Sequence, residues 1–286
     1  MKTKHLRLMQ RVYIILFFCF MYLPIAYMIV FSFNQSKGYS LFTGFTLKWY
    51  RSLFTNASIL HALWVSVEVA VLSAIIATVL GTAASLGIAS MSRKSRLLVT
   101  NITYIPVVNP EIITGISLML LFVAYQRFAE GVSWLPDTIM GMPTLLIAHI
   151  AFNVPYVIFS VLPRLKGMDE HLYEAALDMG ATPGYAVRKV IVPELMPGIV
   201  TGFIMAFTMS FDDFVISFFS TQGIVNNLSV YVYSMARVGI NPKINALSTI
   251  MFVFVMTLLL IINIRADRQS KRQRQNTKFL QKGLSQ

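Results

Sequence analysis

The sequence has little charge for its length and only one cysteine. Charged residues make up 13% of the 286 positions, whereas hydrophobic residues make up 56%. The mean hydropathy is +0.66. This composition indicates a helical membrane protein with several spans rather than a soluble globular domain. Cys19 has no second cysteine with which to form an intrachain disulfide, so redox chemistry gives no guidance to function.

Catalytic motifs are also missing. The chain contains no GxxxxGK[ST] phosphate loop, no HExxH and no GxSxG, and its histidines (His5, His61, His149 and His171) fall in different segments. We therefore expect no catalytic residue, metal or bound cofactor in this chain, and we expect any ATP to be hydrolysed by another subunit. His149 lies within a predicted span, where we expect it to hydrogen-bond to a neighbouring helix; a role in a transport pathway is the alternative.

Six apolar stretches are long enough to cross a bilayer, which takes about 20 residues. They predict an all-α membrane protein with spans at 12–33, 61–91, 97–125, 138–163, 198–220 and 244–264. The first stretch is too long for a signal peptide, and no small-residue cleavage pattern follows it, so we expect it to be retained.

Basic residues set the expected orientation. With the N-terminus inside, lysine and arginine favour the inner segments over the outer segments by about three to one. This excess predicts that both termini and the 166–197 loop are cytoplasmic. The spans form one transmembrane domain over 1–264, with the polar loop at about 164–197. The basic, polar residues 265–286 are expected to be a disordered tail on anionic lipid.

The polar 166–197 loop has helix start and stop signals at both ends. Asp169 is a predicted N-cap, and Gly180 is a predicted helix stop. Thr182, followed by proline, predicts a second helix start, and Pro193 predicts that this second helix ends. The loop is therefore expected to form two short helices with a sharp break.

The first of these helices carries one apolar stripe. Met168, Leu172, Ala176 and Met179 follow one another at spacings of four and three residues. A helix this short needs a partner surface, so the stripe predicts a contact with another groove.

The same loop resembles the EAA loop of binding-protein-dependent ABC importer permeases. The resemblance rests on Glu174, Ala175, Ala176 and Gly180, and on the run VIVP that ends at Pro193, with valine at two positions where the family prefers isoleucine and leucine. It implies the MetI-like permease fold, with these residues coupling the permease to a separate cytoplasmic ATPase. The alternative is a passive amphipathic connector.

Four acids lie within or at the edge of predicted spans, where no lysine or arginine falls: Glu68, near the outer end of the second span, and Glu111, Asp212 and Asp213. A buried carboxylate needs a compensating partner, which this chain does not supply from a basic residue. Neighbouring residues on a helix point about 100° apart, so we expect only one of the two aspartates to face a pathway. The other would pack against a helix or cap a local break. Glu111 follows Asn109-Pro110, and its alternative role is a structural kink at a wet edge.

Runs over nearly the whole chain resemble one permease subunit of the spermidine/putrescine importer family. They are NPEIITGISLMLLF, MSFDDFVISFF and GINPKINALSTI, together with the EAA loop. The resemblance implies a second permease subunit of a different sequence, two copies of an ATPase that binds ATP and Mg, and an external polyamine-binding protein.

Carboxylates without basic neighbours suit a polyammonium solute and do not suit phosphate or sulfate. We therefore regard Glu111, Asp212 and Asp213 as candidates for the substrate pathway. Three alternatives stay open: an ABC importer for another cationic solute, a gradient-driven secondary transporter or channel, and an intramembrane enzyme. The absence of nucleophile and metal motifs disfavours the last of these.

Overall fold

The computed structural model describes residues 2–38, 41–130, 139–169, 171–238, 242–257 and 260. The regular structure in these ranges is helical apart from one isolated bridge between Asn34 and Phe45, which confirms the all-α prediction. The chain divides into two compact units: residues 57–233, and residues 1–56 together with 234–286.

The helices are α1 (Lys2–Phe31), α2 (Lys48–Phe54), α3 (Ala57–Ser90), α4 (Arg93–Val108), α5 (Glu111–Ala129), α6 (Met142–Lys166), α7 (His171–Asp178), α8 (Pro183–Ala186), a π-helical turn η1 (Val187–Ile191), α9 (Val192–Phe211), α10 (Val215–Thr221), α11 (Leu228–Val238), and a helix at Pro242–Thr257.

Five segments among the described residues are long and apolar enough to cross a membrane. They are Met9–Phe31, Ala57–Ser90, Glu111–Ala129, Met142–Lys166 and Pro183–Phe211. The predicted sixth span, 244–264, corresponds to the shorter apolar helix Pro242–Thr257, and its remaining residues, apart from residue 260, lie outside the described part of the chain. The tail at 265–286 also lies outside it. A six-span topology therefore stays a prediction, as do the cytoplasmic termini.

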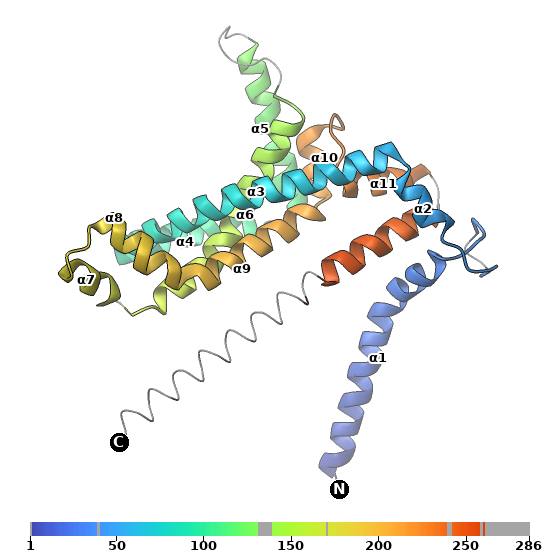
Figure 1. Cartoon of the computed structure of the whole chain (residues 1–286), viewed down its shortest axis with the longest axis horizontal. Coiled ribbons are helices and arrows are strands. Elements are labelled where there is room, and N and C mark those ends of the chain that lie inside the picture. The colour runs from blue at the N-terminus through green and yellow to red at the C-terminus, as the bar shows by residue number, and fades with distance from the viewer. Residues whose placement is uncertain are drawn as a thin grey trace. The chain divides into compact units, whose positions relative to one another are not determined.

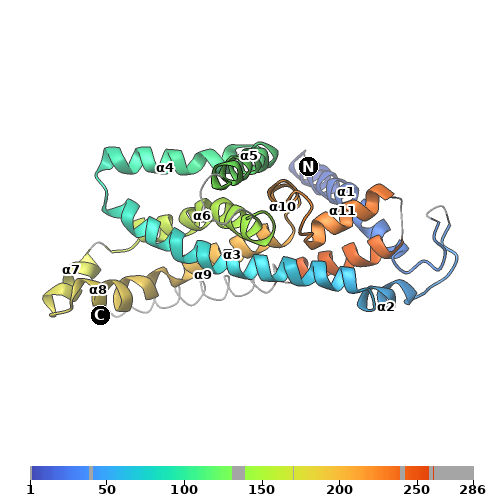
Figure 2. The same ribbon diagram turned by 90° about the horizontal axis from the view of Figure 1, so that it is seen from above.

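The core of the 57–233 unit forms where α3, α6 and α9 pack along one another (Figures 1 and 2). Small residues allow this close approach: a Cβ on Gly81 of α3 would lie 2.7 Å from the side chain of Val157 in α6. Membrane helices associate through such small-residue contacts because lipid offers no hydrophobic driving force between them. The core cluster consists of Ala74, Ala77, Val157, Val161, Ile191, Leu195 and Ala206.

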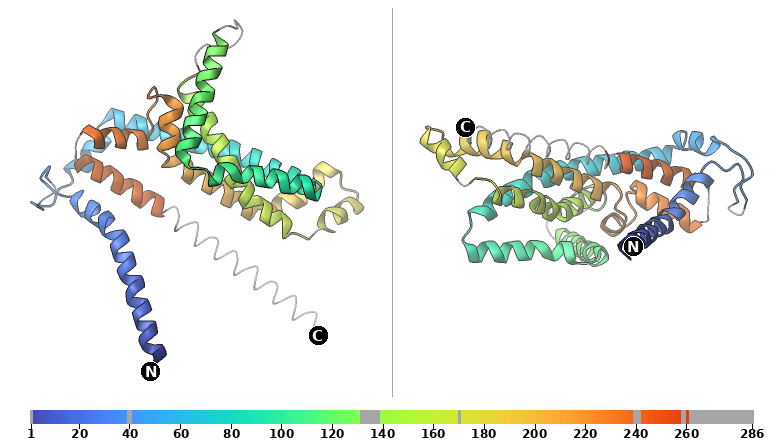
Figure 3. Two further views of the ribbon diagram at one scale, coloured as in Figure 1. Left: turned by 180° about the vertical axis from the view of Figure 1, so that it is seen from behind. Right: turned by 90° about the horizontal axis from the view of Figure 1, so that it is seen from below.

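The third predicted span is divided into two helices. α4 ends at Val108 and α5 begins at Glu111, and α5 leaves α4 at a steep angle (Figure 3). The cause is Pro110, which lacks an N–H and disfavours helical geometry at Asn109, whose ψ is 137°. The single interrupted span at 97–125 is therefore wrong in its bounds, because only α5 has the length and composition of a span.

The fifth predicted span has wrong bounds at both ends. Its helix runs continuously from Pro183 and ends at Phe211, and α10 begins only at Val215. The prediction that Pro193 ends the second loop helix is also wrong. The π-helical turn η1 precedes this proline, and Val192 N–H bonds back five residues to Val187 O, so Pro193 falls in the first turn of α9, where a missing N–H is tolerated.

The aromatic segment after α1 is partly an internal packing element of its unit. The indole N–H of Trp49 donates to Asn34 O at 2.7 Å, and the Trp49 side chain is buried. The Phe33 ring stacks against Phe45 and Tyr50, with centroid distances of 5.2 and 5.0 Å. These contacts show that Phe33, Phe45, Trp49 and Tyr50 pack within the segment.

Candidate functional site

The break between α9 and α10 places two consecutive acids in different surroundings. Asp212 is exposed, whereas Asp213 is 8% exposed. One Asp213 carboxylate oxygen accepts the N–H of Ile216 at 3.2 Å, and the other accepts the N–H of Ser217 at 2.7 Å. Asp213 therefore caps the N-terminus of α10, which is one of the two roles expected for whichever aspartate does not face the pathway.

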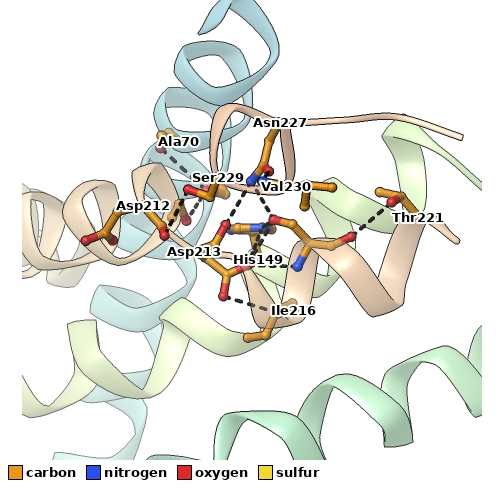
Figure 4. A network of polar contacts seen from close by, with 12 residues as sticks. Ala70, His149, Asp212, Asp213, Ile216, Thr221, Asn227, Ser229 and Val230 are labelled. Carbon is orange, nitrogen blue, oxygen red and sulfur yellow. Dashed lines mark hydrogen bonds and ion pairs between the residues drawn. The ribbon is translucent and has the colours of Figure 1, made fainter. Parts of the chain in front are cut away.

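A buried polar network surrounds this cap (Figure 4). The Ser217 hydroxyl donates to Asp213 Oδ2 at 2.9 Å, and His149 Nε2 of α6 lies 3.0 Å from the same hydroxyl and 3.6 Å from Asp213 Oδ2. The Asn227 amide donates to Ser217 Oγ at 2.7 Å and to the Asp213 backbone carbonyl at 2.9 Å. The expected hydrogen bond between His149 and a neighbouring helix is confirmed.

A second polar cluster lies immediately before the break. Asn153 Nδ2 of α6 donates to Ser210 Oγ of α9 at 2.6 Å, and Ser210 Oγ lies 3.0 Å from Ser73 Oγ of α3. Asn153, Ser210 and Ser73 are all buried. The cluster thus joins the three core helices through polar side chains.

The Glu111 carboxylate lies at the N-terminus of α5 and is exposed. It interacts electrostatically with Asp213 and Asp212, and also with the phenol of Tyr156 on α6. The fold thus brings Glu111 close to Asp212 and Asp213, which lie about a hundred residues later in the chain. None of the three forms an ion pair with a lysine or arginine among the described residues. This concentration of negative charge can stabilise a cation.

The loop between α6 and α9 contains the expected first helix and the expected break. Asp169 Oδ1 accepts the N–H of His171 at 3.0 Å, which confirms the predicted cap of α7. At the other end, Gly180 has a φ of 87°, its N–H donates to Leu177 O, and the N–H of Ala181 donates to Ala176 O. This pair of bonds is a Schellman motif, which satisfies the last carbonyls of α7 and reverses the chain.

The predicted apolar stripe is divided between two surfaces. Met168 packs against the core cluster, whereas the other three residues open onto an exposed concave groove. The groove is lined by Leu172, Ala175, Ala176, Met179, Gly180, Ala181, Thr182, Tyr185 and Val190. Met179 is 90% exposed, and the Glu174 side chain is also exposed, 3.5 Å from His171 Nδ1. The loop thus presents an apolar surface with a carboxylate beside it.

Several polar residues of the site were not identified in the sequence. Ser217 and Asn227 complete the Asp213 network, and Asn153 and Ser210 form the second cluster. One available signal was the occurrence of asparagine and serine inside apolar spans, where such side chains need partners on other helices. Their pairing depends on the contact of α6 with α9 and α10, which sequence spacing does not reveal.

The comparisons with known proteins agree with this architecture. Residues 77–275 match the family described as binding-protein-dependent transport system inner membrane component. The chain is 34% identical, over 93% of its length and 96% of the relative, to the spermidine/putrescine transport system permease protein PotC of Escherichia coli strain K12. It is 36% identical, over 84% of each chain, to the putrescine transport system permease protein PotI of the same strain.

Solved structures give the same fold at lower identity. A chain of a bacterial ABC transporter involved in import of the acidic polysaccharide alginate superposes with a TM-score of 0.68 at 18% identity, covering 95% of this chain and 96% of that one. A chain of the MetNI methionine ABC transporter in an inward-facing conformation gives 0.53 at 20% identity, covering 75% and 95%. On its sequence match and its fold, the chain belongs to the family of binding-protein-dependent transport system inner membrane components.

Proposed function

We propose that this chain is a permease subunit of an ATP-driven importer for polyamines of the spermidine and putrescine class. The observation that carries the proposal is its similarity, over nearly the whole chain, to PotC and PotI, whose names specify transport of these compounds. As a family member of this kind it is a transport subunit and not an enzyme. Six spans with both termini in the cytoplasm complete the proposed topology.

The acids near the two helix breaks support a cationic substrate. Glu111 and Asp212 are exposed carboxylates within each other's electrostatic influence, and Asp213 adds its charge from a buried position. An ammonium group placed among these carboxylates would be attracted by each of them. A polyamine has two or more ammonium groups joined by methylenes and can therefore contact several acids at once. Asp212 is the better candidate for direct contact because Asp213 is occupied as a helix cap.

The groove on the α7 segment supports docking of a cytoplasmic ATPase. Exposed apolar side chains such as Met179 and Leu172 need a partner surface, and Glu174 provides a polar contact at its edge. In the proposed cycle, an external binding protein delivers the polyamine to this chain and a second permease subunit of different sequence. Two ATPase copies carry ATP and Mg, and their closure reaches the permease through Glu174, Ala175, Ala176, Gly180 and Pro193.

A bacterial strain that lacks polyamine synthesis and its own polyamine importers provides the test. Expression of this chain with its partner subunits should restore uptake of labelled putrescine and spermidine, and Asp212→Asn should lower that uptake. If the complex hydrolyses ATP but takes up a different cationic solute, the assignment as a permease subunit stands and the assigned substrate is wrong. Uptake that persists without the ATPase subunit would favour a gradient-driven transporter.

A further inference from the structure

One helix contacts both sides of the α9–α10 break through two buried side chains. Asn153 of α6 donates to Ser210 Oγ, two residues before Asp212, and His149 of α6 contacts Ser217 Oγ, four residues after Asp213. His149 and Asn153 are four residues apart and therefore lie on the same face of α6. Both side chains are fully buried, with an exposed fraction of 0%. A single rigid helix thus fixes the two ends of a short non-helical segment.

The direction of the hydrogen bonds follows from counting protons. Ser217 Oγ has one hydrogen, which it donates to Asp213 Oδ2 at 2.9 Å, and it accepts the Asn227 amide at 2.7 Å. Its remaining lone pair can only accept, so His149 must carry its hydrogen on Nε2 and donate it. His149 therefore fixes the hydroxyl that in turn fixes the Asp213 carboxylate.

The break is also held from α11 and α3. Ser229 Oγ donates to the Asp212 backbone carbonyl at 3.0 Å (Figure 4). The N–H of Leu228 donates to Ser66 Oγ of α3 at 2.8 Å. Ser229 thus holds the backbone of Asp212, while the Asp212 carboxylate stays exposed. The orientation of this carboxylate is set by groups that do not touch it.

His149 and Asn153 each leave one buried atom unsatisfied. His149 Nδ1 and Asn153 Oδ1 have no hydrogen-bond partner among the described residues. A buried polar atom without a partner destabilises the fold, and an apolar side chain of similar shape would avoid this penalty. His149 and Asn153 each still supply a buried hydrogen bond to another helix, one on each side of the break.

We propose that His149 and Asn153 are positioning residues that hold the α9–α10 break so that the Asp212 carboxylate faces the solute. The proposal rests on the proposed function for the identity of that solute. His149 acts after the break through Ser217 and Asp213, and Asn153 acts before it through Ser210. Neither side chain contacts the solute itself.

A cysteine reporter tests the positioning without any transport. The Asp212→Cys variant is made in a Cys19→Ser background and purified as the complex. The rate at which a cationic methanethiosulfonate reagent modifies the thiol at position 212 is then measured. His149→Phe and Asn153→Leu remove the hydrogen bonds while keeping bulk, and each should change the rate by about fivefold, the effect of one lost hydrogen bond. His149→Gln can still donate from its amide nitrogen and should restore the rate. Thr208→Val is the matched control, because the Thr208 hydroxyl donates to Ile204 O of its own helix, α9.

Uptake provides the second readout. His149→Phe should raise the KM for labelled spermidine in the native Asp212 background and should add nothing to Asp212→Asn, because the positioned carboxylate is then already lost. A reporter rate unchanged in His149→Phe and Asn153→Leu, in complexes that elute as intact assemblies, would overturn the positioning proposal. If the reporter rates change but the complex transports no polyamine, the positioning role of His149 and Asn153 stands and the proposed substrate is contradicted.

Discussion

Asp212 and Asp213 are consecutive in the chain, yet one exposes its carboxylate and the other buries it as the cap of α10. The difference arises because α9 ends at Phe211 and the next three residues are not helical. The buried acid stabilises the break, and the break exposes its neighbour. The two aspartates therefore have separate tasks, although both carry the same charge.

Substitution of the two aspartates should separate binding from stability. Asp212→Asn should lower polyamine uptake about tenfold through loss of a charged contact, and leave the unfolding free energy within about 0.5 kcal/mol of the native value. Asp213→Asn should lower uptake as well, and also destabilise the 57–233 unit by about 1 kcal/mol through weakening of the cap. Labelled uptake and thermal unfolding of the purified complex measure the two effects. Native uptake in both variants would move the solute path away from this break.

The turn at Gly180 should be required for coupling. Proline cannot replace Gly180 there, because proline cannot adopt the φ of 87° and has no N–H to donate to Leu177 O. Gly180→Pro should lower ATP-driven uptake about tenfold or more while the complex still hydrolyses ATP and inserts in the membrane. Gly180→Asn is the control, since asparagine tolerates a positive φ. Glu174→Ala should uncouple in the same direction. Full transport in both Gly180→Pro and Glu174→Ala would remove the coupling role of this loop.

The groove beside α7 should bind the ATPase through its apolar lining. Met179→Glu places a charge on a side chain that is 90% exposed and should reduce co-purification of the ATPase about tenfold, the effect expected of a hot-spot residue. Ile224→Glu, which changes a 62% exposed residue between α10 and α11, should leave co-purification unchanged. Equal ATPase recovery from both variants would show that the groove is not the docking surface.

The predicted orientation can be checked with single cysteines in a Cys19→Ser background. Cysteines replacing Lys94 and Glu174 should react with a membrane-impermeant maleimide only after the cells are opened, since the excess of basic residues predicts that these positions are cytoplasmic. Cysteines replacing Lys37 and Gln222 should react in intact cells. The reverse labelling pattern would invert the topology.

The sequence predicted the helical class, three of the spans to within a few residues (12–33, 61–91 and 138–163), and the cap and stop of α7. These features depend on local signals: long apolar runs, Asp169 before a helix, and a glycine after it. Pro193 misled the prediction because proline disrupts a helix interior but is tolerated in a first turn. The π-helical turn that precedes it has no sequence signature of its own.

The acids of the candidate site could be picked out from the sequence, but the polar side chains that contact them could not. Glu111, Asp212 and Asp213 stand out because charges are rare in apolar segments. Which aspartate is buried depends on where α9 ends, and this end is fixed by contacts of Asn153 and His149 made across helices. Such contacts join residues more than fifty positions apart, so no local pattern indicates them.

The central claim is ATP-driven polyamine import, and uptake of radiolabelled spermidine into proteoliposomes tests it most directly. The vesicles would hold this chain with its second permease subunit, the ATPase and the external binding protein, with and without ATP on the ATPase side. We predict uptake that requires ATP and is competed by putrescine. Spermidine uptake that is indifferent to ATP, or ATP hydrolysis that proceeds with no spermidine uptake at all, would contradict the account.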